Sequence, residues 1–189
     1  MRIMTGKLKG RVIKMPPGIR PTQNRVRKAI FDILGDISGL SILELFAGSG
    51  AVGLEAMSQG AVELILVESD RNCCLAIEKN IESLKVSGCR LYPLKAEEAI
   101  KMLHKAGKRF DLVFLDPPYY TGLGKKILQM LAGYDILAPN AFIIVEHFRR
   151  DDLPVTLGAL NLFKQSRYSD SVLSFYRKNV PESNISRNL

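Results

Sequence analysis

Residues 44–53 read Glu-Leu-Phe-Ala-Gly-Ser-Gly-Ala-Val-Gly and decide the class of fold. They join a predicted strand at 41–46 to a predicted helix at 51–59, and Gly48, Gly50 and Gly53 match the pattern GxGxxG. Glycines at these positions let the backbone turn sharply and approach a nucleoside closely. Glu68 lies twenty residues after Gly48, at the end of the next predicted strand, where a carboxylate accepts hydrogen bonds from ribose hydroxyls. The loop therefore predicts an adenosine-binding site in an α/β fold.

A second motif, Asp116-Pro117-Pro118-Tyr119, follows a predicted buried strand at 110–115. Two consecutive prolines remove two backbone donors and hold the chain extended, so the neighbouring carbonyls are not used in a helix. The motif predicts a rigid rim of acceptors, formed by the Asp116 carboxylate and main-chain oxygens, beside the ring of Tyr119. Such a rim suits a planar amine, for example the exocyclic amino group of a nucleobase. The alternative is an ordinary turn after a strand.

The glycine loop alone does not separate a nicotinamide dinucleotide from S-adenosylmethionine, because both contain adenosine. Glu44 lies four residues before Gly48, where it would repel a pyrophosphate but would suit the methionine ammonium of S-adenosylmethionine. The motif beginning at Asp116 has a role in amino-methyl transfer and none in hydride transfer. The two motifs together favour S-adenosylmethionine.

The apolar pattern predicts strands that alternate with helices, which indicates right-handed βαβ units and a mostly parallel sheet covered on both faces. The strands are expected at 41–46, 62–68, 90–94, 110–115 and 141–146, with a closing antiparallel pair at 160–166 and 171–177. The helices are expected at 51–59, 71–85, 96–105 and 124–132. We predict three segments: a basic front segment at 1–36, a catalytic domain at 37–180 and a flexible tail at 181–189.

The chain of 189 residues has a net charge of +8, and the excess is confined to its first 31 residues. That segment contains nine basic residues and no acid, which favours a polyanionic partner such as a phosphate backbone. Ile3, Val12 and Ile13 interrupt the charges, so we expect a hairpin that carries arginines. A helix with Thr22 as its N-cap should follow.

The chain has three cysteines without CxxC spacing and only two histidines, a pattern that indicates neither a disulfide framework nor a His/Cys metal site. No apolar run approaches the 18 to 20 or so residues that a membrane span requires, and no signal-peptide core is present. We expect a cytoplasmic, monomeric protein without metal. His104 and His147 are expected to be structural, with lining of the substrate site as the alternative for His147, and Cys73 and Cys74 are expected to be partly buried helix residues.

These motifs together resemble the bacterial RsmD family of 16S rRNA guanine-N2 methyltransferases. The glycine loop and the Asp-Pro-Pro-Tyr motif are typical of amino-methyltransferases generally. The Arg-Pro-Thr segment and the arginines that follow it are what limit the resemblance to this one family. The resemblance runs from about residue 2 to 177 and includes Arg2-Ile3, Gly6, Gly10-Arg11, Arg20-Pro21-Thr22, Arg25-Val26-Arg27, Phe31, residues 46–50, Glu68, residues 116–119 and Glu146-His147.

The resemblance implies a Rossmann-like class I methyltransferase with a seven-stranded sheet whose last strand is antiparallel. It implies methyl transfer from S-adenosylmethionine, with S-adenosylhomocysteine as product, to N2 of one guanine in 16S rRNA of the small ribosomal subunit or its assembly intermediate. The catalytic candidates are Asp116, Pro117, Pro118 and Tyr119. The cofactor-binding candidates are Glu44, Phe46, Ala47, Gly48, Ser49, Gly50, Gly53, Glu68, Ser69 and Ala96. The RNA-binding candidates are Arg2, Lys7, Lys9, Arg11, Arg20, Thr22, Arg25 and Arg27.

Two departures from the family pattern matter. Lys95 stands where these enzymes often carry Asp or Asn against the adenine amine, and Glu44 replaces the commoner Asp. The other functions that remain open are methylation of adenine N6 in DNA or RNA, methylation of a protein glutamine, RNA binding without turnover, and NAD-dependent oxidoreduction.

Overall fold

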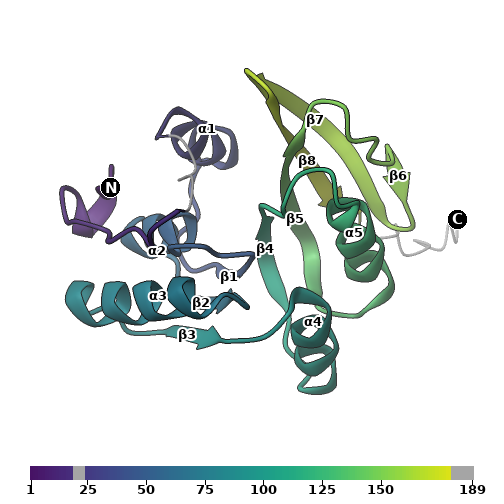
Figure 1. Cartoon of the computed structure of the whole chain (residues 1–189). Helices are drawn as coiled ribbons and strands as arrows, with labels where there is room; N and C mark the ends of the chain where they lie inside the picture. Colours follow the sequence, from purple (N-terminus) through teal and green to yellow (C-terminus); the bar gives the residue numbers. More distant parts are fainter. Residues whose placement is uncertain (19–23, 180–189) are drawn as a thin grey trace, which may run out of the picture.

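The computed structural model describes residues 1–18 and 24–179, and within them it shows one mixed sheet of eight strands in the order β3-β2-β1-β4-β5-β8-β7-β6 (Figure 1). The strands are β1 (Ser41–Leu45), β2 (Glu63–Val67), β3 (Cys89–Tyr92), β4 (Phe110–Leu115), β5 (Leu137–Phe148), β6 (Thr156–Leu157), β7 (Leu160–Tyr168) and β8 (Ser171–Lys178). The helices are η1 (Gly6–Leu8), α1 (Asn24–Leu34), α2 (Ala51–Ser58), α3 (Arg71–Leu84), α4 (Ala96–Lys105) and α5 (Leu123–Gly133).

The first five strands are parallel, and β8 inserts antiparallel between β5 and β7. This arrangement confirms the predicted Rossmann-like fold with its antiparallel closing strand. The sheet has one strand more than expected because the two-residue β6 pairs with β7. Strand β5 is also longer than the predicted segment at 141–146, and it extends to Phe148.

Both faces of the sheet are buried at β1, β2 and β4, which explains the nearly continuous apolar runs of these strands. Because successive side chains of a strand point to opposite faces, Ile42 packs into the core under α1, α2 and α3, and Leu43 packs into the core under α4 and α5. Figure 1 shows these two groups of helices against the sheet. No helix of the described ranges 1–18 and 24–179 is long and apolar enough to cross a membrane.

The basic front segment is not a hairpin of two strands. Its sections come together through one antiparallel bridge between Arg2 and Val12, with the short helix η1 between them. Ile3 and Ile13 belong to the same core as Ile42, so the segment shares the core of the catalytic domain. The predicted boundary near residue 36 therefore does not separate two hydrophobic cores.

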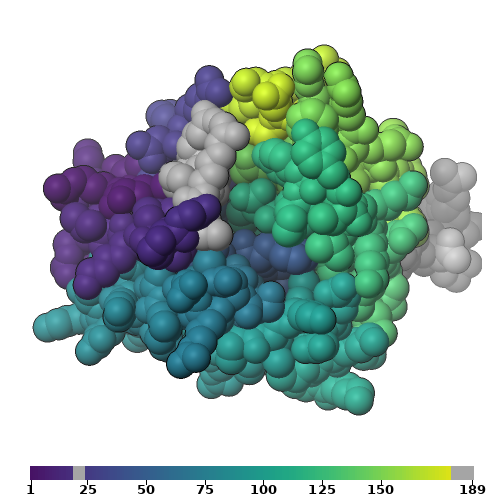
Figure 2. Space-filling view, viewed as in Figure 1, coloured from purple at the N-terminus to yellow at the C-terminus, as the bar shows by residue number. Residues whose placement is uncertain are grey.

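Polar contacts with α2 fix the front segment in place. The carboxylate of Glu55 accepts hydrogen bonds from the backbone N–H of Met4 at 2.9 Å and of Thr5 at 2.8 Å. The hydroxyl of Ser58 donates to the carbonyl of Thr5 at 2.6 Å and accepts from the N–H of Leu8 at 2.9 Å. In Figure 2 the segment, coloured purple, lies directly against the rest of the chain.

Arg27 completes this attachment from inside the protein. Its side chain is fully buried, lies 3.6 Å from the Glu55 carboxylate and donates to the carbonyl of Arg2 at 2.6 Å. The structure thus corrects the expectation that Arg27 binds RNA phosphates, since a buried guanidinium is out of reach of solvent and RNA. The sequence pattern did not distinguish it from Arg25, which is exposed on the same helix.

We expect Arg27→Met to lower the free energy of unfolding by about 3–5 kcal/mol, because it leaves the Glu55 carboxylate buried without its cation. The matched control is Arg25→Met, which removes the same charge from an exposed position and should change stability by less than about 0.5 kcal/mol. Urea unfolding of both variants measures the difference. Equal small losses would show that the buried ion pair does not hold the front segment.

Candidate active site

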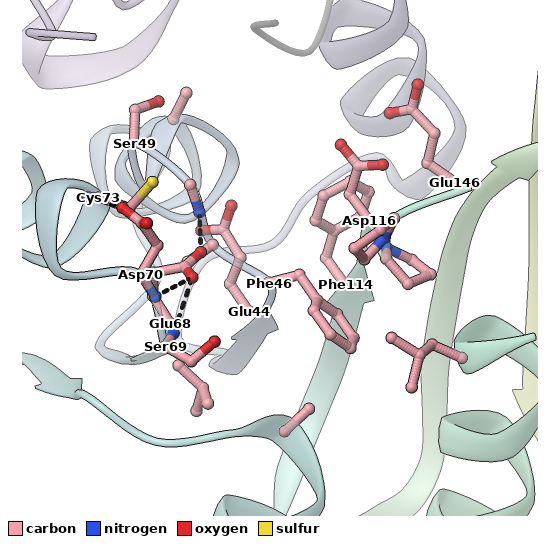
Figure 3. Close-up of a pocket in the computed structure, with 18 of the residues that line it drawn as sticks. Glu44, Phe46, Ser49, Glu68, Ser69, Asp70, Cys73, Phe114, Asp116 and Glu146 are labelled. Carbon is pink, nitrogen blue, oxygen red and sulfur yellow. Dashed lines mark hydrogen bonds between the residues drawn. The ribbon is translucent and has the colours of Figure 1, made fainter. Parts of the chain in front are cut away.

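A cavity of about 830 Å³ opens at the carboxyl edge of the parallel strands, where ligands bind in open α/β sheets. The segments that follow β1, β2 and β4 line it, together with the start of α4, the end of β5 and the turn between β7 and β8. Figure 3 shows Glu44 and Glu68 on one side of the cavity and Asp116 and Glu146 on the other. Twelve candidates from the sequence lie in its lining: Glu44, Phe46, Ala47, Gly48, Ser49, Glu68, Ser69, Ala96, Asp116, Pro117, Pro118 and Tyr119.

The glycine loop turns through left-handed backbone conformations, with φ of 57° at Gly48 and 72° at Gly50. Phe46 also has a positive φ of 58°, an uncommon conformation for a residue with a side chain. Gly53 meets a different constraint, because a Cβ there would lie 2.5 Å from Leu64 Cδ1 and 2.6 Å from an oxygen of Glu44. Gly50 and Gly53 therefore shape the site from behind its lining.

Glu68 closes the glycine loop onto the next strand. One of its oxygens accepts from the N–H of Gly48 at 2.8 Å, and the other accepts from the N–H groups of Ser69 and Asp70 at 2.7 and 2.9 Å. A carboxylate offers about four lone-pair positions, so these three bonds leave room for about one more donor. The oxygen facing Gly48 can thus accept one further hydrogen bond.

Glu44 is buried at the base of the cavity and accepts a hydrogen bond from the N–H of Gly53 at 2.7 Å. Burial raises the pKa of this carboxyl to about 8, against the opposing effects of backbone N–H groups and of Arg27, and the charge of Glu68 adds to the increase. The group therefore holds a proton near neutral pH until a cation or a donor arrives beside it.

Asp116 follows β4 and is half-buried in the cavity wall. Burial raises its pKa well above the usual range, and the charges of Glu146 and Glu44 raise it further. The parallel register explains the proximity of Glu146, since Leu115 pairs with Val145 and the next residue of each strand carries a carboxyl group. Glu146 is 6% exposed and lines the cavity. Sequence reasoning missed it as a site residue, although its place at the end of a predicted strand was a usable signal.

The start of α4 brings Lys95, Ala96 and Glu97 to the cavity. Lys95 occupies the N-cap position, and its side chain makes no capping hydrogen bond. Ala96 is buried, and the carboxylate of Glu97 is bound by Lys126 at 2.9 Å. The structure also brings in residues that the sequence did not single out, among them Met15, Asp70, Cys73, Leu94 and the turn at 168–171.

The RNA-binding candidates take different positions. Arg2, Lys7, Lys9, Arg11 and Arg25 are exposed, whereas Arg20 and Thr22 lie outside the described residues. Arg11 donates to the carbonyl of Ser83 on α3 at 2.6 Å, and Arg2 donates to the carbonyl of Gly10 at 2.7 Å. None of these residues lines the cavity within the described ranges, and Arg11 contacts the end of α3, away from the helix start that borders the cavity.

His147, Cys73 and Cys74 are buried, whereas His104 is exposed on α4. His147 is buried, with Nε2 2.8 Å from the hydroxyl of Ser174 and Nδ1 3.0 Å from the carbonyl of Phe148. Burial lowers its pKa. Cys73 and Cys74 are buried on α3. Among the described residues, no group of three or more His, Cys, Asp or Glu side chains is placed to hold a metal ion.

Comparisons with known proteins agree along nearly the whole chain. A family model described as "Conserved hypothetical protein 95" matches residues 1–177. YlbH of Bacillus subtilis, provisionally named an rRNA methyltransferase, is 36% identical over 185 residues, which cover 94% of this chain and 99% of YlbH. Ribosomal RNA small subunit methyltransferase D of Escherichia coli K12 is 33% identical over 181 residues, which cover 94% of this chain and 90% of that protein. The solved structure of yhhF from Escherichia coli, provisionally named a methyltransferase, has a TM-score of 0.84 at 32% identity and covers 95% of this chain and 98% of its own.

We expect Glu44→Gln to flatten the dependence of stability on pH. Below pH 4.5 the Glu44 carboxyl is protonated in both the folded and the unfolded state, and its contribution to the free energy of unfolding is fully present. As the pH rises toward 8 only the folded state keeps the proton, so the free energy of unfolding falls. Glutamine still accepts from Gly53 but does not titrate. Urea unfolding at several pH values between about 5 and 8 tests this, with the exposed Glu98→Gln as control. A decline as steep as in the wild type would contradict the assignment.

We also expect Glu146→Gln to lower the pKa of Asp116, because it removes a negative charge that raises it. Carbon-13 NMR titration of labelled aspartate carboxyl groups measures the pKa directly, and Asp116→Asn identifies the resonance. The exposed Glu98→Gln is again the control. An Asp116 resonance that titrates at the same pH in Glu146→Gln would show that the two carboxyl groups do not interact.

Proposed function

Because the chain belongs to the RsmD family, the family of ribosomal RNA small subunit methyltransferase D, we propose that it transfers a methyl group from S-adenosylmethionine to the exocyclic N2 of a guanine in small-subunit rRNA. One observation carries the proposal: the glycine loop with its two glutamates and the acceptor rim at Asp116 line a single cavity. An adenosine site and an amine site that share one cavity place a donor and an acceptor side by side.

The residues present fit S-adenosylmethionine, which when bound supplies an electrophilic methyl group on a sulfonium. Glu68 has capacity for about one more donor, which suits a ribose hydroxyl. Glu44 would lie near the methionine ammonium, whose charge favours the ionised carboxylate over the protonated form. Leu94 and Ala96 offer apolar surface to the adenine, and the backbone N–H groups at the start of α4 offer donors.

The rim at Asp116 acts on the amino group of the target base. The 2-amino lone pair of guanine is delocalised into the ring, so the nitrogen is a poor nucleophile in its planar form. Hydrogen bonds from that amino group to the Asp116 carboxyl and to the Pro117 carbonyl favour a pyramidal nitrogen with its lone pair available. Alignment of the reacting atoms then lowers the barrier by several kcal/mol without an acid or a base.

Asp116 also accepts the proton that the amino nitrogen loses as its bond to carbon forms, directly or through water. Its raised pKa makes it a stronger proton acceptor than an exposed aspartate, and Glu146 contributes to that increase. Tyr119 offers a ring face to the base, which leaves its helical stack to reach the cavity.

The exposed cations of the front segment would bind phosphates of the RNA. Lys7, Lys9 and Arg25 are exposed, and their attraction to phosphates weakens as salt displaces it. Arg27 would contribute to RNA binding only indirectly, because it holds in place the front segment that carries the exposed cations.

The decisive assay is transfer of a radiolabelled methyl group from S-adenosylmethionine to small ribosomal particles, protein-free rRNA and DNA, followed by nucleoside analysis. We expect label in N2-methylguanine of rRNA. Asp116→Ala should lower turnover by about 10²–10⁴-fold because it removes an acceptor that acts on the reacting nitrogen. Binding of S-adenosylhomocysteine, measured by calorimetry, should stay unchanged.

The matched control is Asp152→Ala, which removes an exposed carboxylate outside the cavity and should leave turnover unchanged. Label in N6-methyladenine would replace the proposed substrate with adenine, which the acceptor rim also suits. Loss of cofactor binding in Asp116→Ala would mean that Asp116 serves the structure of the site and not the chemistry.

A further inference from the structure

Tyr120 is the most exposed large apolar side chain of the described residues, with 75% of its surface accessible. It follows the Asp-Pro-Pro-Tyr motif directly, and its neighbour Tyr119 lines the cavity. The centroid of its ring lies 4.8 Å from that of Phe148, which is buried, and 6.3 Å from that of Tyr119. Phe148 therefore supports one part of the Tyr120 ring from within, and the rest faces solvent.

The backbone of Tyr120 is unusual as well. Its φ of 63° falls in the left-handed region, which glycine and asparagine adopt readily and an aromatic residue adopts with strain. The turn around it is built to hold this geometry: the hydroxyl of Thr121 donates to the carbonyl of Pro118 at 2.7 Å, and Gly122 also has a positive φ. Neither the strained backbone of Tyr120 nor the exposure of its ring stabilises the folded protein, which points to a role in binding.

We propose that Tyr120, backed by Phe148, is a second stacking site that receives the nucleobase next to the target guanine in the RNA. This inference rests on the proposed function, because it takes RNA to be the substrate. An aromatic face binds any base by stacking, so the site would accept the neighbouring nucleotide with little preference for which base it carries.

The angle between the ring planes of Tyr119 and Tyr120 indicates how this site would act on the RNA. The planes of Tyr119 and Tyr120 are inclined at 88°, so two bases that stack on them cannot stack on each other. Occupation of Tyr120 by the neighbouring base therefore favours the open step that lets the target base enter the cavity. The site stabilises the unstacked RNA without contact to the reacting atoms, which makes Tyr120 a positioning residue.

Charge beside this ring suits the same ligand. Arg149 and Arg150 follow Phe148 directly and are exposed. Arg149 Nε lies 3.5 Å from an oxygen of Asp170, which lines the cavity. A phosphate that links two splayed nucleotides needs a cation of this kind close to their bases.

The test compares Tyr120→Asn with Tyr120→Phe in the full chain. Asparagine adopts a positive φ more readily than tyrosine, so it should leave the melting temperature unchanged or raise it, while the stacking face is lost. Binding of a short single-stranded oligoribonucleotide with a central guanine, measured by fluorescence anisotropy in the presence of S-adenosylhomocysteine, should weaken about 5- to 100-fold. Tyr120→Phe keeps the face and should bind as the wild type does.

A spectroscopic signal identifies the stacking itself. An oligoribonucleotide that carries 2-aminopurine next to the guanine should lose fluorescence on binding to the wild type and to Tyr120→Phe, and should keep it with Tyr120→Asn. Affinity for S-adenosylhomocysteine should be the same in all three proteins. Wild-type RNA affinity and quenching in Tyr120→Asn, or weaker binding together with a lower melting temperature, would overturn the inference.

These readouts do not depend on turnover. If RNA binding and quenching respond to Tyr120 but no methyl transfer to rRNA occurs, the proposed function fails and the stacking site stands. If rRNA is methylated and Tyr120→Asn changes neither the affinity nor the KM for RNA, the proposed function stands and the stacking site is wrong.

Discussion

The close contact of α2 with the sheet is the constraint on which the rest of the structure depends. Gly53 permits it, because a Cβ at that position would lie 2.5 Å from Leu64 and 2.6 Å from the Glu44 carboxyl. The same approach lets the N–H of Gly53 bind Glu44 at the base of the cavity. From its other side α2 presents Glu55, which accepts from the front segment and pairs with Arg27. One helix thus fixes both the cofactor side of the cavity and the segment that carries the exposed cations.

Carboxyl groups dominate the electrostatics of the cavity. Burial raises the pKa of Glu44 and of Asp116, and the proximity of Glu146 raises that of Asp116 further. A site of this kind disfavours anionic ligands and becomes more acidic when a cation enters, which suits a cosubstrate that carries a sulfonium and an ammonium. The cationic residues lie outside, on the front segment and after β5, where phosphates can reach them. The separation of charge matches a substrate whose backbone is anionic and whose reacting group is a neutral amine.

Most of the fold could be predicted from the sequence because its signals are local. The alternation of apolar strands with helices placed α4 at 96–105 and β4 at 110–115, as the structure has them. The front segment was harder, because one antiparallel bridge and a short helix leave little periodicity to read. The additional strand β6 has only two residues and is defined by its pairing with β7, so no local sequence pattern predicts it. The glycine loop, Glu68 and the rim at Asp116 were found because each occupies a fixed offset from a strand end.

By itself the sequence determined the strand and helix order, the chemical types at the loop after β1 and the loop after β4, and the concentration of positive charge at the front. Only the tertiary structure decided which charges are available. Arg25 and Arg27 are two residues apart on one helix, yet one is exposed and the other is buried against Glu55. The register of β4 and β5 brings Glu146 beside Asp116, and the left-handed turn after Pro118 places the ring of Tyr120 in solvent. The physical reason is the same in each case: burial and proximity depend on contacts between residues distant in sequence, and these contacts decide whether a charged or aromatic group packs, titrates or binds.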